Sequence, residues 1–327
     1  MKTIDIIVPF HRINDFLFES IDAIKNSESV KPRIILSNDS HVENNKLPAV
    51  LQKLSVVKAG EFSGFPNAVN SARRLLENAY TTIVASDDLV DRQKLSKQIN
   101  SLSSDYDISI CEIEKINDRG KIIRSANSFP SYRTYDPSWL LFGPYGADGT
   151  WVAKTDWWLR NVNMPLGPFH DWELALKVLP VSRVVALNES LIFYRMHSSQ
   201  TSRTFDLKSI TALQSFYQTW TRVNENYGLP ILDFSNMLAV TQPWYSPKNV
   251  SLDRNQIDRW LEAWILRCNE KRYDLHSSLY LKWMYLRFQR NLPVKLPLSR
   301  SQFVFQSARL TINAPALIGS YIRRREV

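Results

Sequence analysis

Thr81-Thr82-Ile83-Val84-Ala85-Ser86-Asp87-Asp88 is a β-branched run that ends on two adjacent carboxylates. Threonine, isoleucine and valine favour the pleated backbone, so residues 81–85 are predicted to form a buried strand. Asp87 and Asp88 then lie at its carboxyl end, where open α/β sheets bind their ligands. One carboxylate could hold a divalent cation and the other could bind a hydroxylated ligand, but a solvated turn explains the pair equally well by itself.

Strands alternate with helices on both sides of this run. Alternation at this spacing is typical of βαβ units with a mostly parallel sheet, and right-handed crossovers bring the strand ends to one edge. That edge is expected to carry Pro9, Asp39 and the Asp87–Asp88 pair as a ligand site. The strands are predicted at residues 4–8, 33–37, 54–58, 81–85 and 108–111, and the helices at 16–25 (capped by Asp15), 64–76 and 92–102.

Two segments after residue 140 add acidic candidates. Asp148 lies in a glycine-rich stretch before a predicted strand at residues 151–153. A helix that begins near residue 170 carries Asp171 and Glu173 in its first turn. Acidic residues at that position also complement the helix dipole, so a purely structural role remains open for both.

A strand predicted at residues 191–197 delivers Arg195 and His197 to a loop rich in hydroxyl groups. His197 could complete the coordination of a metal or donate to a phosphate oxygen. The planar guanidinium of Arg195 could contact phosphate, but an ion pair with an acidic residue at the sheet edge is an equally good interpretation.

Charge and composition divide the chain of 327 residues into two predicted domains, 1–205 and 206–327. Residues 1–205 hold 24 Lys and Arg against 23 Asp and Glu, whereas residues 206–327 hold 17 against 9, within a net charge of +9. Helices are predicted at residues 206–227 and 254–271, with a turn-rich connection at 230–247. A basic, aromatic-rich helix at residues 275–289 could lie in a membrane interface or pack on the first domain.

Other bulk features point to a cytoplasmic location. No apolar stretch approaches the length that spans a bilayer, and the amino-terminal residues lack the pattern of a signal peptide. The two cysteines, Cys111 and Cys268, are far apart in the sequence, which suits a reducing compartment and gives no metal-binding spacing. Both are expected to be buried packing residues.

The order of motifs over residues 3–205 resembles the family 2 glycosyltransferases, whose fold is the Rossmann-like GT-A type. Three departures stand out: Val69 replaces the usual Arg, Ala85 replaces the first Asp of an Asp-x-Asp-Asp motif, and His170 replaces a Glu. The matching motifs are Val8-Pro9-Phe10-His11, Asp39, the segment from Gly64 to Asn70, Ser86-Asp87-Asp88, His170-Asp171-Trp172 and Tyr194-Arg195-Met196-His197.

The resemblance implies an α/β GT-A domain followed by a mainly helical region, and an inverting transfer of sugar from a nucleotide donor, with UDP favoured. Asp171 would be the general base, with Glu173 as the alternative. The acceptor is expected to be a lipid-linked glycan of a polysaccharide pathway, and the enzyme to lie peripherally on the inner face of the cell membrane. Donor binding would fall to Pro9, Phe10, Asp39, Gly64, Asn70, Asp87 and Arg195, acceptor binding to Asp148 and Trp172, and Mn²⁺ or Mg²⁺ to Asp88 and His197.

The sequence also bears on two other function classes, a nucleotidyltransferase and a protein that binds an anionic surface without catalysis. A nucleotidyltransferase would want a glycine-rich phosphate loop after the first strand, and residues 9–13 contain no glycine. A catalytically degenerate protein that binds an anionic surface, either membrane or nucleic acid, is compatible with the net charge. The basic excess lies outside the α/β part and among long aliphatic residues, which favours lipid, so no nucleic acid is expected as a partner.

Overall fold

The computed structural model describes residues 1–123, 148–166, 169–179, 182–200, 210–226, 228–241, 253, 255–260 and 262–263. The chain divides into two compact units, one of Met1–Tyr135 with Pro144–Thr204 and the other of Asp136–Gly143 with Phe205–Val327. Segments 124–147, which include the predicted glycine-rich stretch up to residue 147, and 264–327, which include the predicted helix at 275–289, lie outside the described residues.

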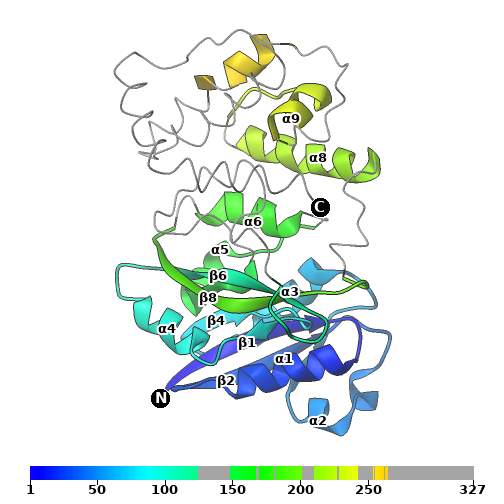
Figure 1. The fold of residues 1–327 in the computed structure, drawn as a ribbon, viewed down its shortest axis with the longest axis vertical. Helices are drawn as coiled ribbons and strands as arrows, with labels where there is room; N and C mark the ends of the chain where they lie inside the picture. The colour runs from blue at the N-terminus through cyan, green and yellow to red at the C-terminus, as the bar shows by residue number, and fades with distance from the viewer. Residues whose placement is uncertain are drawn as a thin grey trace. The chain divides into compact units, whose positions relative to one another are not determined.

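An eight-stranded mixed sheet forms the centre of the first unit (Figure 1). Its strands lie in the order β3-β2-β1-β4-β7-β6-β8-β5, and four of the seven pairings are parallel. The fold class is therefore the predicted one, although three antiparallel pairings enter through β7 and β5. The strands are β1 (Lys2–Phe10), β2 (Val30–Asn38), β3 (Ser55–Lys58), β4 (Tyr80–Ile83), β5 (Leu89–Val90), β6 (Ile108–Asn117), β7 (Trp151–Lys154) and β8 (Val184–Met196).

Helices cover both faces of this sheet, because alternate residues of its central strands are apolar on both sides. Ile6 and Val8 of β1 share a buried core with Leu17 and Leu95, which belong to α1 and α4. On the other face Ser37 of β2 donates a hydrogen bond of 2.6 Å to the Ala68 carbonyl of α3. The helices of this unit are α1 (Asp15–Lys25), α2 (Ala49–Gln52), α3 (Phe65–Ala72), α4 (Lys94–Ser101), α5 (Thr155–Asn161) and α6 (His170–Val178).

Several local predictions are corrected. The N-cap of α1 is Asn14, whose side chain accepts the N–H of Leu17, and Asp15 is the first helical residue. Strand β4 ends at Ile83, two residues earlier than predicted, although the N–H of Val84 still donates to the Ile7 carbonyl. Helix α5 was not predicted. Its Trp157 and Trp158 are buried, so tertiary packing stabilises a segment that has few helix-favouring residues.

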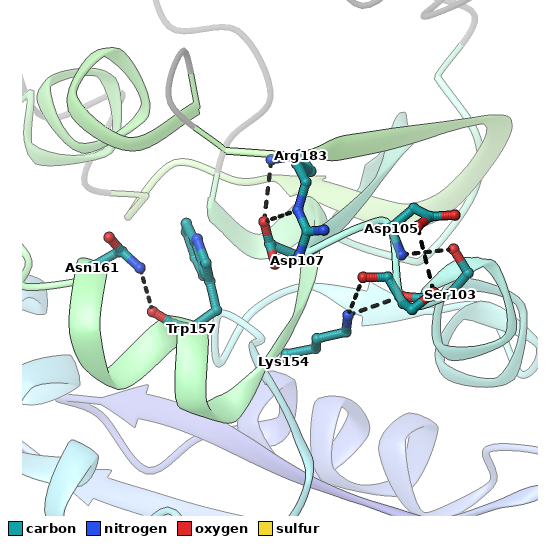
Figure 2. Close-up of polar contacts among 8 residues, drawn as sticks. Ser103, Asp105, Asp107, Lys154, Trp157, Asn161 and Arg183 are labelled. Atoms are coloured by element: carbon teal, nitrogen blue, oxygen red, sulfur yellow. Dashed lines mark hydrogen bonds and ion pairs between the residues drawn. The ribbon is translucent and has the colours of Figure 1, made fainter.

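Polar contacts hold the edge of the sheet where β6 and β8 begin and β7 ends (Figure 2). Arg183 forms a bidentate ion pair with Asp107 at 2.7 and 2.9 Å, and this pairing lowers the pKa of Asp107 and raises that of Arg183. Lys154 donates to the Ser103 carbonyl at 2.9 Å. These contacts fix the start of β6 and β8, so their carboxyl ends can be placed accurately at the opposite edge.

The second unit contains α8 (Ile210–Asn226), α9 (Phe234–Thr241) and a helical segment at residues 255–260. Trp220 packs against Trp260 with 5.5 Å between ring centroids, and the Trp260 indole donates to Asn224 at 2.8 Å. Helix α9 lies in the stretch predicted as a turn-rich connection, so that prediction is wrong. Among the described residues, no helix is both long and apolar enough to cross a membrane.

Candidate functional site

The acidic turn, residues 84–88, follows β4 and holds the two adjacent carboxylates. The hydroxyl of Ser20 in α1 donates to the Ala85 carbonyl at 3.2 Å, and the N–H of Asp88 donates to the same carbonyl at 3.2 Å. Asp87 is partly exposed and Asp88 is largely buried. The turn therefore points its two side chains into different surroundings, as expected from residues that are adjacent at a strand end.

The carboxyl end of β8 lies directly against the acidic turn. The backbone N–H of Arg195 donates to Asp88 Oδ1 at 2.9 Å. His197 Nε2 lies 3.0 Å from Asp87 Oδ2, and His197 Nδ1 lies 3.0 Å from Ser199 Oγ. Residues separated by more than a hundred positions in the sequence therefore meet because β5 pairs antiparallel with β8, Leu89 opposite Phe193.

Asp87, Asp88 and His197 offer carboxylate oxygen and imidazole nitrogen at one place, which suits Mn²⁺ or Mg²⁺. Within the described part of the chain, no three His, Cys, Asp or Glu side chains are arranged as a ready-made metal cage. Mg²⁺ commonly takes only one or two protein carboxylates, and substrate phosphates and water complete its shell. The donor set therefore fits a metal that arrives with a diphosphate, and Asp88 and His197 stay predicted ligands.

Arg195 is engaged by partners within the protein, and donor binding stays a prediction for this residue. Its side chain is 1% exposed, and its three guanidinium nitrogens donate to Glu19, to the Asp118 carbonyl and to the Asp87 carbonyl. Of the two interpretations left open by the sequence, the ion pair is the one found. A phosphate ligand would therefore have to compete with these three partners for the guanidinium.

Asp39 organises the loop that leads into α3. Its Oδ1 accepts the N–H and hydroxyl of Ser63 at 2.8 and 2.6 Å, and its Oδ2 accepts the N–H of Gly64 at 2.8 Å. Gly64 has a φ of 95°, which a side chain would strain, so glycine lets this amide point at the carboxylate. Asp39 is itself buried, and both predicted residues thus shape the loop.

Two other predicted donor residues lie in the interior, and a third is half-buried. Pro9 is buried in β1, and Phe10 belongs to the core shared with α1. The Asn70 side chain donates to the Met164 carbonyl at 3.0 Å and accepts the Met164 N–H at 2.9 Å, so it ties α3 to the segment after α5. Phe10 and Asn70 therefore have partners within the protein, and donor binding stays a prediction for all three residues.

His11, which the sequence reasoning passed over, lies beside the site. His11 is the first residue after β1 and is partly exposed, and a polar residue directly after a predicted strand was a signal present in the sequence. Burial and the nearby Arg12 lower the pKa of His11, while Asp39 and Asp87 act in the opposite direction. The His11 imidazole is thus placed near both carboxylates.

Phe62 forms an aromatic row with two histidines at the rim of this loop. Its ring lies 6.4 Å from that of His11, edge-on, and 6.2 Å from that of His41, stacked. Phe62 is 61% exposed and adopts a φ of 53°, a left-handed conformation that is costly for a residue with a side chain. Neither its exposure nor its dihedral angle could be read from the sequence.

The proposed base lies at the start of α6. His170 stacks on Phe65 at 5.1 Å between centroids, which brings this end of α6 to the start of α3. Asp171 and Glu173 are partly exposed, and Asp171 Oδ1 accepts the N–H of Trp172 at 2.8 Å. Trp172 is completely buried, and its contact with the acceptor stays a prediction.

Asp148 begins the short 3-10 turn Asp148–Thr150 before β7, and its side chain lies outside the described residues.

Comparison with known proteins supports the same region as a catalytic domain. Residues 5–157 match the model of Glycosyl transferase family 2. Among curated proteins, none matches the chain. The acidic turn and the ends of β1, β2 and β4 fall within the matched segment, whereas the end of β8, with Arg195 and His197, lies after it.

Solved structures share the fold at low sequence identity. S. aureus TarS, residues 1–349 in complex with UDP-GlcNAc, has a TM-score of 0.57 and 14% identity, over 92% of this chain and 95% of that chain. Its complex with UDP has a TM-score of 0.53 and 14% identity, over the same shares of the two chains. The mannosyltransferase PcManGT from Pyrobaculum calidifontis, in complex with GDP-Man and Mn²⁺, has a TM-score of 0.50 and 12% identity, over 98% and 84%. Over residues 5–157 the chain is thus similar to Glycosyl transferase family 2, and its fold is the one that these solved structures share.

Proposed function

We propose that the chain is an inverting glycosyltransferase that moves a sugar from a nucleoside diphosphate donor, with UDP favoured, to a hydroxyl of a glycan acceptor. The observation that carries the proposal is the meeting of Asp87, Asp88 and His197 at the strand ends of a family 2 domain. The UDP-GlcNAc and UDP bound to TarS support uracil as the nucleobase of the donor. The GDP-Man and Mn²⁺ bound to PcManGT support the use of a divalent metal.

The donor would lie along the edge formed by the acidic turn, His11 and the Asp39 loop. The diphosphate would approach Asp88 and His197 with its metal, and Asp87 would face the ribose. A bound Mn²⁺ or Mg²⁺ supplies Lewis-acid stabilisation of the negative charge that develops on the leaving diphosphate. The nucleobase of the donor would reach the row of His11, Phe62 and His41, where the exposed ring of Phe62 can stack on it.

The acceptor would meet the donor sugar from the side of α6. Asp171 would take the proton of the attacking hydroxyl as the bond to the anomeric carbon forms. Because a single general base acts on one face of the donor sugar, transfer is a single displacement, and the configuration at the anomeric carbon inverts. Glu173 is the alternative base, but residues two apart on a helix point in different directions. Asp148 is proposed to contact the acceptor sugar.

The acceptor is proposed to be lipid-linked, as in the building of a surface polysaccharide, with the enzyme peripheral on the inner face of the cell membrane. The support is the net charge of +8 over residues 206–327. A second candidate is a degenerate transferase that binds an anionic surface without catalysis. Ala85 and His170, which replace two family carboxylates, favour this candidate.

A nucleotide panel separates these candidates. UDP, GDP, dTDP and CMP are each added with and without Mn²⁺ to the wild type, to Asp88→Asn and to Asp156→Asn, an exposed carboxylate in α5 that serves as the matched control. A ligand that binds only the folded state raises the melting temperature by mass action. We expect UDP with Mn²⁺ to stabilise the wild type and the control but not Asp88→Asn.

The outcome decides between enzyme and binding protein. If no nucleotide shifts the wild type, the donor site is refuted. Binding to anionic vesicles would then favour the degenerate candidate. If UDP does bind, release of UDP from UDP-sugars in the presence of acceptor glycans tests transfer directly, and the anomeric configuration of the product tests inversion.

A further inference from the structure

The guanidinium of Arg195 joins three separate segments beneath the acidic turn. Its Nη2 forms an ion pair of 2.6 Å with Glu19 of α1, and its Nη1 donates to the Asp118 carbonyl, after β6, at 2.9 Å. Its Nε donates to the Asp87 carbonyl at 2.8 Å. Since the same residue donates its backbone N–H to Asp88 Oδ1, Arg195 contacts both residues of the acidic pair.

One face of α1 supports this arrangement. The guanidinium carbon lies 4.5 Å from the centre of the Phe16 ring, and the His197 ring lies 5.0 Å from the same ring. Phe16 and Glu19 are three residues apart, so they share a face of the helix. That face therefore holds the guanidinium by charge and by cation–π attraction, and it also orients His197.

Because Arg195 is buried, the energetic cost of its charge depends on its hydrogen-bond and ion-pair partners. A charge removed from water is tolerated only when it is paired and hydrogen-bonded. Glu19 supplies the opposite charge, and its side chain is half exposed and belongs to none of the family motifs. The two carbonyl oxygens complete the set, so moving any of the three segments would leave a buried donor unsatisfied.

We propose that Arg195, held in place by Glu19, is the positioning residue of the acidic turn. It fixes the Asp87 backbone and the Asp88 carboxylate before a metal–diphosphate ligand arrives. The ligand part of this inference rests on the proposed function. Groups that orient a ligating carboxylate from behind typically contribute a factor of about 10–100 to metal affinity, because the carboxylate otherwise has to be ordered on binding.

The side chains offer conservative variants with matched controls. Arg195→Lys keeps the charge but has a single nitrogen, which cannot reach all three oxygens. Glu19→Gln keeps an acceptor for the Arg195 guanidinium and removes the opposite charge. Arg160→Lys is the control for the first variant, because Arg160 is an exposed arginine of α5. Asp22→Asn is the control for the second, because Asp22 is exposed on the same helix.

The first measurement is hydrogen exchange of the ligand-free proteins. We expect amides of residues 84–88 to exchange about tenfold faster in Arg195→Lys, the equivalent of one lost charge-assisted hydrogen bond, while amides of β1 keep the wild-type rate. The second measurement is titration with UDP in the presence of Mn²⁺. The dissociation constant should rise about 10–100-fold in Arg195→Lys and up to about fivefold in Glu19→Gln, and stay unchanged in both controls.

Each result has a defined meaning. Unchanged exchange at residues 84–88 in both variants overturns the proposal, whatever happens to the affinity for UDP. Faster exchange throughout β1 as well as in the turn also overturns it, since Arg195 would then only stabilise the fold. A further result is faster exchange confined to the turn in the variants, while the wild type binds no UDP. That result supports the positioning role of Arg195 and refutes the proposed function instead.

Discussion

Lys94 should destabilise the folded protein, and replacing it with methionine should reveal by how much. The residue is the first of α4, its side chain is completely buried, and its ammonium group has no hydrogen-bond partner among the described residues. Burial lowers the pKa of Lys94 from 10.5 to about 8, against a small opposing effect of Cys111. Burial likewise raises the pKa of the Cys111 thiol from 9.0 to about 11.

The pKa shift sets the size and sign of the effect. The pKa of Lys94 differs by about 2.5 between the unfolded and the folded chain, which corresponds to roughly 3 kcal/mol. At pH 7 this whole cost is present, because Lys94 is protonated in both the folded and the unfolded chain. Between pH 8 and 10.5 the unfolded chain binds more protons at this site than the folded one, so stability rises with pH. Cys111 acts oppositely between pH 9 and 11, and measurements at pH 7 to 9 therefore isolate Lys94.

The assay is urea unfolding of the wild type and of Lys94→Met at pH 7, 8 and 9. Methionine keeps the aliphatic volume and removes the charge, so we expect the free energy of unfolding at pH 7 to rise by about 2–3 kcal/mol. The advantage of the variant should shrink towards pH 9. Lys97→Met is the control, because Lys97 is one turn further on, partly exposed and paired with Glu189, and it should change little.

Two results would refute this reasoning. If Lys94→Met is less stable than the wild type at pH 7, the ammonium group has favourable interactions that outweigh its burial. If the difference between the two proteins is the same at pH 7 and pH 9, then the pKa of Lys94 is not lowered in the folded state.

Three further changes test the site. Phe62→Ala should weaken UDP binding by about 1–3 kcal/mol, the usual value of a base–aromatic stack, without loss of stability, because the ring is exposed; equal affinity in calorimetry would contradict the stacking role. Asp39→Ala should cost about 1–3 kcal/mol of stability in urea unfolding, since three donors of Ser63 and Gly64 lose their acceptor; an unchanged midpoint would count against the loop assignment. Asp171→Asn should lower kcat about 10²–10⁴-fold with KM nearly unchanged, and the reverse ranking with Glu173→Gln would reassign the base.

Much of the α/β framework could be predicted, because its signals are local. The strand at residues 4–8 follows from a short run of β-branched residues, and the helix at 16–25 follows from apolar residues at helical spacing; the structure has β1 and α1 there. Helix α9 was missed, because a stretch flanked by prolines and polar residues gives a weak periodic signal. The N-cap of α1 was predicted one residue too late, because Asn14 and Asp15 are both good capping residues.

The site was predicted less completely than the fold. The acidic pair and His197 were found because polar groups at strand ends are visible in the sequence, and the structure brings them together. His11 could have been found as a polar residue that directly follows the first strand. Glu19 could not, because it lies in an ordinary helix and meets Arg195 across 176 positions.

The sequence by itself determined most of the strands and helices of the α/β part and the position of the acidic pair, because backbone propensity and short motifs act between neighbouring residues. Only the tertiary structure decided which polar groups are used internally and which remain open to a ligand. Arg195, Asn70 and Asp39 carry donor or acceptor groups that the sequence assigned to a nucleotide, and each is engaged by a partner from another segment. Such pairings depend on burial and on contacts between distant positions, and neither is encoded by a residue and its neighbours alone.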